Sequence, residues 1–341
     1  MPKNVIVGCH STQLSQQERA LFKELQPWGL ILFARNINTP AQIKALINES
    51  KAAMGREHLM VFIDQEGGRV SRLPKTHWRV PPSPTVFAKM YQTNQEHAKR
   101  ACMLNALLSG LELKVLGINA NCAPMLDIPQ NNSSTIITER ALGATSQQVI
   151  ALGQQITLGL KQANVAPVIK HMPGHGRAIS DSHLELPVVN ASLNELKDWD
   201  FLPFKALAEE SMAMTAHIVF PQIDKNLPAT ISPIVVNKIM REMIGFNGLI
   251  MTDDINMHAL SGTVASRAQQ AVEAGCDIAL HCSGEFDEMQ SLLKVAKPLE
   301  GLALARALKA EKIAFAQNSQ RNPPSTIEEI TGELDSLLAK Y

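Results

Sequence analysis

The stretch Ala166–Pro187, APVIKHMPGHGRAISDSHLELP, joins a short apolar run to a loop that is dense in polar side chains. Its first four residues are typical of a buried β-strand. A helix cannot continue through Pro173, Gly174 and Gly176, because proline and glycine destabilise a helix interior. A plain surface connection is the alternative, but titratable groups crowded beside a strand end are typical of active sites. We therefore expect this loop to carry chemistry.

Similar apolar runs recur along the chain. The eight runs are Val5–Cys9, Gly29–Phe33, Leu59–Ile63, Asn119–Pro124, Ala166–Lys170, Ala213–His217, Leu249–Thr252 and Ile278–His281. The helix-like segments that alternate with them are Gln16–Leu25, Ala41–Met54, Glu96–Leu116, Gln147–Gln162, Leu193–Glu210, Pro233–Met243, Val264–Ala274 and Glu285–Val295. Strands and helices that alternate at this spacing form parallel pairs through right-handed crossovers. Eight units in roughly 300 residues predict an α/β fold, a (β/α)8 TIM-type barrel.

A doubly wound open sheet would give a similar alternation, but the polar residues favour a closed barrel. Five of the runs end at or just before polar side chains, namely Asp64, Asp127, Lys170 with His171, His217 and Asp253. In a barrel these strand ends meet at one mouth, whereas the outer strands of an eight-stranded open sheet lie too far apart.

A single domain is expected. We assign residues 1–300 to a catalytic barrel and residues 301–341 to C-terminal helices packed on it. Those helices are expected at Gly301–Gln317 and Ser325–Lys340, separated by Asn322-Pro323-Pro324.

Composition restricts the class of protein. The 341 residues are 45% hydrophobic, and 32 basic side chains balance 32 acidic ones. Such a chain can bury a large core, and it lacks the basic excess that a nucleic-acid or membrane-surface partner normally requires. We expect a small-molecule ligand, no signal peptide, no membrane span and a cytoplasmic location. The five cysteines have no C-x-x-C spacing and are expected to be reduced.

The segment at residues 64–72, DQEGGRVSR, turns from a strand end into two arginines. A carboxylate at Asp64 could accept hydrogen bonds from a sugar diol, and an arginine could hold a hydroxyl, carbonyl or carboxylate group. The alternative is an ion-paired turn that only ties loops together.

The strand-like segment at residues 248–254, GLIMTDD, ends in two carboxylates. We expect Asp253 to face the barrel mouth, where an ionised carboxylate can act as a nucleophile or a metal ligand. We expect Asp254 to turn into the loop as a helix N-cap.

The loop histidines suggest proton transfer. Asp181 and His183 are spaced so that a carboxylate can orient an imidazole, which suits a proton donor near neutral pH. His171 and His175 would need a shared helical face to form a metal pair, and Pro173 removes that helix. Six histidines have no evident partner and are expected to be structural or exposed: His10, His58, His77, His97, His258 and His281.

Six segments together resemble glycoside hydrolase family 3 β-N-acetylhexosaminidases, and more narrowly the compact single-domain bacterial enzymes of peptidoglycan recycling. In chain order they are IDQEGGRVSR, NANCAPMLDI, TIITERALG, IKHMPGHGRAISDSHLELP, MTAHIVFPQID with PATISP, and GLIMTDDINM. The similarity extends from about Val5 to about Glu285.

The resemblance implies a (β/α)8 barrel that removes non-reducing terminal N-acetylglucosamine from β-1,4-linked N-acetylglucosaminyl-1,6-anhydro-N-acetylmuramic acid, with or without its peptide, and retains anomeric configuration. Asp253 matches the catalytic nucleophile, and His183 matches the general acid/base, oriented by Asp181. The positions that match the residues gripping N-acetylglucosamine are Asp64, Arg72, Arg140, Lys170 and His171. The resemblance implies no metal or organic cofactor.

The chain departs from the family pattern at three positions. Thr138 in TIITER stands where the family usually has a glycine, Met172 replaces a more usual aromatic residue, and Arg177 adds a positive charge after the PGHG turn. Thr138 bears on the placement of Arg140.

Other functions also fit parts of the pattern. A metal-dependent hydrolase of the amidohydrolase kind would use strand-end histidines, Lys170 and Asp253 as zinc ligands, but no H-x-H pair follows the first strand. A catalytically silent sugar-binding protein would not need a nucleophile and a proton donor together. A relative that acts on β-glucosides or as a phosphorylase is the remaining alternative.

Overall fold

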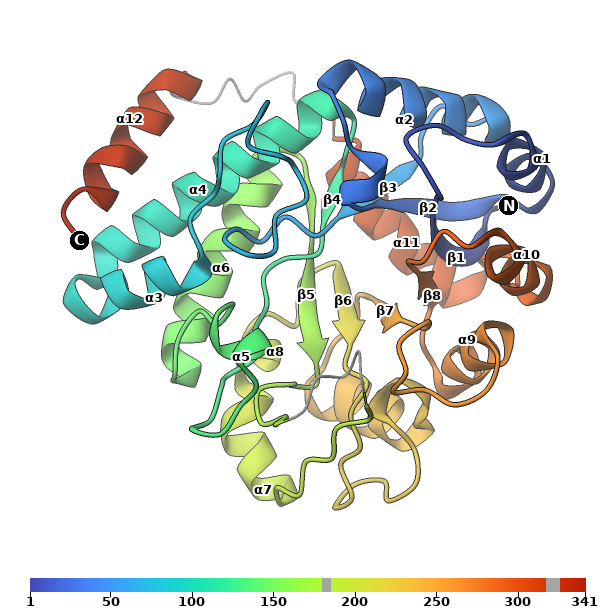
Figure 1. Ribbon diagram of the computed structural model, residues 1–341. Coiled ribbons are helices and arrows are strands. Elements are labelled where there is room, and N and C mark those ends of the chain that lie inside the picture. The colour runs from blue at the N-terminus through green and yellow to red at the C-terminus, as the bar shows by residue number, and fades with distance from the viewer. Residues whose placement is uncertain (180–184, 317–325) are drawn as a thin grey trace.

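The computed structural model describes residues 1–179, 185–316 and 326–341, and within them eight parallel strands close into a barrel in chain order (Figure 1). The strands are β1 (Lys3–Gly8), β2 (Pro27–Leu32), β3 (Met60–Ile63), β4 (Ala120–Asn121), β5 (Ala166–Met172), β6 (Met212–Thr215), β7 (Leu249–Asp254) and β8 (Ile278–His281). The barrel closes where β8 pairs with β1. The predicted TIM-type barrel is confirmed, and each predicted run contributes a strand.

Helices surround the strands on the outside (Figure 1). The long ones are α1 (Gln16–Leu25), α2 (Pro40–Met54), α3 (Pro84–Thr93), α4 (Gln95–Leu116), α6 (Ser146–Gln162), α9 (Val264–Ala274) and α10 (Phe286–Val295). Their starts follow from local sequence: Ser15 forms a capping box with Glu18, and Thr39 caps α2 just before Pro40. The short ones are η1 (Ala34–Asn36), α5 (Thr135–Thr138) and η3 (Ala229–Ile231).

Two predicted helices have a different form. The segment predicted at Leu193–Glu210 is divided into α7 (Leu193–Glu195), the π-helix η2 (Leu196–Asp200) and α8 (Leu202–Ala206). The second predicted helix, η4 (Ile234–Met243), is also a π-helix. The hydrogen bonds show the π-helical pattern at η2, where the Phe201 N–H donates to Leu196 O, five residues earlier. Helix α3 was not among the predicted helices.

The strands place side chains alternately in two layers. Phe62 faces the barrel interior, where side chains from the strands pack together, while residues of the other parity pack against the helices. Two residues beyond Phe62, Asp64 shares the interior face at the C-terminal end of β3. The same alternation places Lys170, on β5, and Asp253, on β7, on the interior face. Strand parity therefore brings three predicted site residues to one mouth.

Two helices follow the eighth unit. Helix α11 (Gly301–Ala314) contributes apolar residues to the interior cluster of the barrel, and its Glu311 accepts a 2.7 Å hydrogen bond from Trp28 Nε1. Helix α12 (Ile327–Leu338) lies against α4, where Arg100 pairs with Glu333 at 2.6 Å (Figure 1). We propose that residues 301–341 extend the barrel domain. The predicted breaker 322–324 lies outside the described residues.

Nowhere in the described parts of the chain is a helix both long and apolar enough to cross a membrane. All five cysteines are free, and Cys9, Cys102, Cys122 and Cys276 are buried.

Candidate active site

A cavity of 360 Å³ opens at the C-terminal ends of the strands. Six of the eight predicted site residues line it, namely Asp64, Arg72, Arg140, Lys170, His171 and Asp253. The other two, Asp181 and His183, lie outside the described residues. The barrel mouth is where enzymes of this fold place their active sites, so the cavity is the candidate active site.

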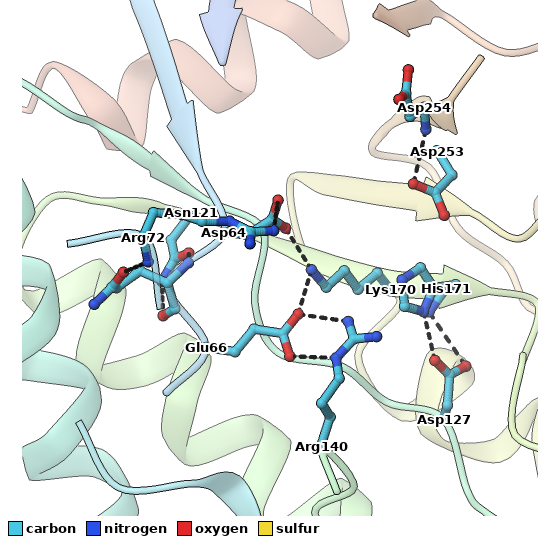
Figure 2. Close-up of polar contacts among 11 residues, drawn as sticks. Asp64, Glu66, Arg72, Asn121, Asp127, Arg140, Lys170, His171, Asp253 and Asp254 are labelled. Atoms are coloured by element: carbon cyan, nitrogen blue, oxygen red, sulfur yellow. Dashed lines mark hydrogen bonds and ion pairs between the residues drawn. The ribbon is translucent and has the colours of Figure 1, made fainter. Parts of the chain in front are cut away.

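One side of the cavity is a network of ion pairs, which we call the charged wall: Asp64, Glu66, Arg72, Arg140 and Lys170 (Figure 2). Lys170 Nζ lies 2.7 Å from Asp64 Oδ1 and 2.6 Å from Glu66 Oε1. Glu66 also accepts two hydrogen bonds from Arg140, at 2.7 and 2.9 Å. Arg72 lies 3.4 Å from the second oxygen of Asp64. Each buried charge therefore has an opposite partner, as burial requires.

The ion pairs keep the charged wall ionised. Burial alone would raise the pKa of Glu66, but Arg140 and Lys170 outweigh burial and hold that pKa well below its usual range. The pKa of Asp64 is lowered in the same way, against the effect of burial, by Lys170 and Arg72. Burial would lower the pKa of Lys170, but Asp64 and Glu66 raise it above its ordinary value.

A protonated Lys170 cannot bind a metal ion, so it cannot serve as the zinc ligand that the amidohydrolase alternative requires. No group of three or more histidine, cysteine, aspartate or glutamate side chains in the described ranges could hold a metal ion.

The backbone of the charged wall is fixed from β4. Asn121 accepts the Gln65 N–H at 3.0 Å and donates to Gln65 O at 2.9 Å, so a side-chain amide continues the strand pairing past the end of β3. Gln65 Oε1 in turn accepts the Arg72 N–H at 2.8 Å. Gly67 has a φ of +106°, and a Cβ there would lie 2.2 Å from Pro82 O. The turn between Asp64 and Arg72 is thus held at both ends.

A buried carboxylate orients His171, near the end of β5, and His175, just after it. Asp127 Oδ2 lies 2.6 Å from His171 Nδ1 (Figure 2). Its Oδ1 accepts the His175 N–H at 2.6 Å. Burial would raise the pKa of Asp127, but the contacts with His171 and His175 lower that pKa more strongly, so the net shift is downward. Burial lowers the pKa of His175 to about 4.

Asp253 faces the cavity from β7. The pairing of β7 with β6 ends at Met251, and its pairing with β8 shifts register between Met251 and Asp254. Asp253 Oδ1 accepts the Asp254 N–H at 2.8 Å (Figure 2). This register shift places the carboxylate at an irregular strand end, a feature common beside active sites.

The N-cap prediction for Asp254 is wrong. Its Oδ1 accepts N–H groups of Asn256, at 3.1 Å, and Cys282, at 3.0 Å, so it stabilises a turn and joins it to β8. The next helix, α9, begins ten residues later and is capped by Thr263.

The loop after β5 is anchored up to residue 179. A Cβ on Gly176 would lie 2.0 Å from Ile128 O, so only glycine allows this approach. Arg177 does not enter the cavity lining; its Nε pairs with Asp200 Oδ2 at 2.7 Å. Burial raises the pKa of Asp200 to about 6, and Arg177 opposes that rise. Further along, after residue 184, the Val189 N–H donates to Val219 O at 2.9 Å.

Sequence reasoning missed Glu66, Asn121 and Asp127 as site residues. A signal existed for Glu66, because three cations were predicted beside Asp64, and cations gathered in one site require a second anion. Asp127 was noted at a strand end without a role, and nothing in the sequence distinguished Asn121. Two histidines expected to lack partners have them: His97 contacts the Tyr341 hydroxyl at 2.9 Å, and His281 contacts Ser283 at 3.0 Å.

Known proteins resemble this chain over most of its length. Residues 4–313 match the model of the glycosyl hydrolase family 3 N terminal domain. A β-hexosaminidase of Thiobacillus denitrificans is 35% identical over 86% of this chain and 83% of its own. One from Methylococcus capsulatus is 37% identical over 80% of each chain.

Solved structures agree. NagZ from Neisseria gonorrhoeae, in complex with N-trifluoroacetyl-D-glucosamine, superposes with a TM-score of 0.88 at 29% identity and covers 99% of this chain and 98% of its own. A family 3 β-N-acetylglucosaminidase from Paenibacillus sp. FPU-7 gives a TM-score of 0.86 at 30% identity, over 98% of this chain and 66% of its own. This chain therefore belongs to glycoside hydrolase family 3, and within it to the bacterial β-hexosaminidases.

Proposed function

We propose that the protein is a retaining exo-β-N-acetylglucosaminidase of peptidoglycan recycling. Its substrate is β-1,4-linked N-acetylglucosaminyl-1,6-anhydro-N-acetylmuramic acid, with or without the peptide, and it removes the non-reducing terminal sugar. The observation that supports this proposal is the 360 Å³ cavity in which the charged wall faces the carboxylate of Asp253. The ligand in the Neisseria NagZ structure, an N-acylated glucosamine, is consistent with the same sugar here.

The charged wall suits a sugar ring. Sugar hydroxyls both donate and accept hydrogen bonds, and the wall alternates carboxylate acceptors with cationic donors. We assign Asp64 to a pair of ring hydroxyls, with Lys170 and Arg72 donating to the sugar oxygens. Because Asp127 holds the Nδ1 edge of His171, that ring keeps one orientation toward the cavity.

The chemistry takes two displacement steps. Asp253 attacks the anomeric carbon as the glycosidic bond breaks, and His183, oriented by Asp181, gives its proton to the leaving oxygen. The products of this step are a glycosyl ester on Asp253 and the free N-acetylmuramic acid derivative. Water then attacks the same carbon, His183 takes a proton from it, and Asp253 leaves as a carboxylate. Two inversions at one carbon retain its configuration.

The test is release of 4-nitrophenol from its β-N-acetylglucosaminide in EDTA. Wild type should be active, Asp253→Ala should lose at least about 10⁴-fold in kcat, and His183→Ala should lose most with poor leaving groups. The exposed His58 supplies a matched control as His58→Ala. Loss of wild-type activity in EDTA, or activity retained in Asp253→Ala, would contradict the mechanism.

The natural substrate needs a separate measurement. Purified disaccharide with and without peptide should both yield N-acetylglucosamine, and NMR of the first-formed sugar should show the β-anomer. A first-formed α-anomer would refute retention, and transfer of the sugar to phosphate in place of water would identify a phosphorylase.

A further inference from the structure

Two of the sequence segments singled out above, MTAHIVFPQID and PATISP, supply none of the polar site residues so far described. The structure joins them beneath the nucleophile. Thr215 and His217 come from the first segment, and Thr230 comes from the second. All three side chains are completely buried. They form a continuous hydrogen-bonded chain between β6 and β7.

The contacts are short. Thr215 Oγ1 lies 2.7 Å from Thr230 Oγ1, and Thr230 Oγ1 lies 2.7 Å from His217 Nδ1. The other ring nitrogen, Nε2 of His217, lies 3.0 Å from the carbonyl oxygen of Asp254. The N–H of Asp253 points to Thr215 Oγ1 at 3.4 Å. This series of hydrogen bonds therefore begins at Asp253 and ends at Asp254, the two residues at the end of β7.

Counting donors and acceptors fixes where the protons lie. The carbonyl of Asp254 can only accept, so Nε2 of His217 must carry a proton. Nδ1 of a neutral ring is then bare and must accept the single hydroxyl proton of Thr230. Thr230 in turn accepts from Thr215, which accepts the Asp253 N–H. Thr230 then does not donate its hydroxyl proton to Ala216 O, which lies farther away at 3.1 Å.

The reverse arrangement fails at one point. If Nδ1 carried the proton of a neutral ring, the Nε2 lone pair would face the Asp254 carbonyl oxygen, and two acceptors would be buried against each other. An imidazolium would satisfy both contacts. However, burial lowers the pKa of His217 more than the nearby carboxylates Asp253 and Asp254 raise it. The lowered pKa favours a neutral ring near pH 7.

We propose that Thr215, Thr230 and His217 are positioning residues for the nucleophile, and that His217 works as the neutral Nε2–H tautomer. The pairing of β7 with β6 stops at Met251, so backbone hydrogen bonds no longer support the end of β7 from this side. The side-chain network replaces that support. It holds the N–H of Asp253 and the C=O of Asp254, and so fixes the peptide that carries the attacking carboxylate.

The kinetic part of this inference rests on the proposed function, but the tautomer does not. The first measurement is therefore NMR of protein with ¹⁵N-labelled histidine near pH 7, with His217→Gln used to identify the His217 signals. The expected result is a bare Nδ1 and a protonated, slowly exchanging Nε2. A protonated Nδ1 would overturn the proposal, whether in a neutral ring or in an imidazolium.

The second measurement is a set of threonine variants. Thr230→Val keeps the shape of the side chain and removes the proton that Nδ1 accepts, so kcat should fall roughly tenfold to a hundredfold with little change in KM. Thr230→Ser keeps the hydroxyl and should restore kcat and the tautomer. Thr157→Val removes another buried hydroxyl, which bonds within α6, and should leave kcat unchanged.

The outcomes separate the two proposals. If Thr230→Val and Thr157→Val have the same kcat as wild type, the positioning role is refuted. If Thr230→Val does not fold, the wild-type tautomer and the kinetics of Thr230→Ser still decide. If the NMR result is as expected but the wild type does not cleave N-acetylglucosaminides, the proposed function fails and the network stands.

Discussion

The two sides of the cavity are built differently. The charged wall consists of five ionised side chains that pair with one another, whereas Asp253 is supported on the opposite side by the neutral network of Thr215, Thr230 and His217. Three cations against two carboxylates leave the charged wall with one positive charge (3 − 2 = 1), which complements the Asp253 carboxylate across the cavity (Figure 2).

The difference separates holding a sugar from attacking it. Strong, charge-assisted hydrogen bonds suit a surface that must grip hydroxyl groups in a fixed pattern. Neutral hydrogen bonds fix the nucleophile's backbone without placing another charge beneath it. Changes on the charged wall, or at the buried carboxylate Asp127, should therefore affect stability and binding, and the stability effects should depend on pH. Changes in the neutral network should affect turnover.

The largest effect on stability is expected for Lys170→Met. This change leaves Asp64 and Glu66 buried with one cation fewer, which should cost about 3–5 kcal/mol of unfolding free energy. Lys238→Met is the matched control, because Lys238 pairs with Glu242 on an exposed helix surface and such pairs contribute about 0.3–0.5 kcal/mol. Urea unfolding measures both. Equal losses in the two variants would show that the charged wall is not a stabilising network.

The next effect is the pH dependence of Asp127→Asn. The folded-state pKa of Asp127 is lowered, so its charge stabilises the protein fully above the unfolded pKa near 4 and loses that effect as pH falls below it. The variant should be about 2 kcal/mol less stable than wild type at pH 7, and the gap should narrow below about pH 4.

Thr230→Val supplies the contrast from the neutral network. Its difference from wild type in unfolding free energy should change much less over the same pH range, because neither side chain titrates. A gap for Asp127→Asn that widens as pH falls would reverse the sign of the argument.

An effect of similar size, on binding instead of stability, is expected for Glu66→Gln. The amide keeps one acceptor oxygen but turns an NH₂ group toward Arg140 or Lys170, so both cations lose their fixed position. We expect kcat/KM to fall roughly 30-fold, or about 2 kcal/mol, mainly through KM. Glu139→Gln is the control, because Glu139 is exposed and pairs with Arg69. A loss confined to kcat would place Glu66 in the chemistry instead of in binding.

The barrel and much of the charged wall could be predicted from the sequence. Parallel strands are continuous apolar runs, and a charged residue at the end of such a run is visible at once, as with Asp64, Lys170 and Asp253. The divided helix at Leu193–Glu210 could not be predicted, because π-helical turns are rare.

The neutral network could not be found from the sequence either. Thr215 and Thr230 are fifteen positions apart, belong to a common residue type and carry no charge. Their role depends on where β6 stops pairing with β7, which only the structure gives. Helix α3 is a different kind of miss, since Ser83-Pro84 is an ordinary helix start that could have been read.

The most direct test of the account is to trap the covalent intermediate. A 5-fluoro-N-acetylglucosaminyl fluoride has a good leaving group, so the protein should form the glycosyl ester faster than water can hydrolyse it. Mass spectrometry of the digested protein should then find one added sugar on the peptide that contains Asp253, and none in Asp253→Asn. A sugar on any other residue, or turnover with no ester formed, would contradict the assignment of Asp253 as the nucleophile.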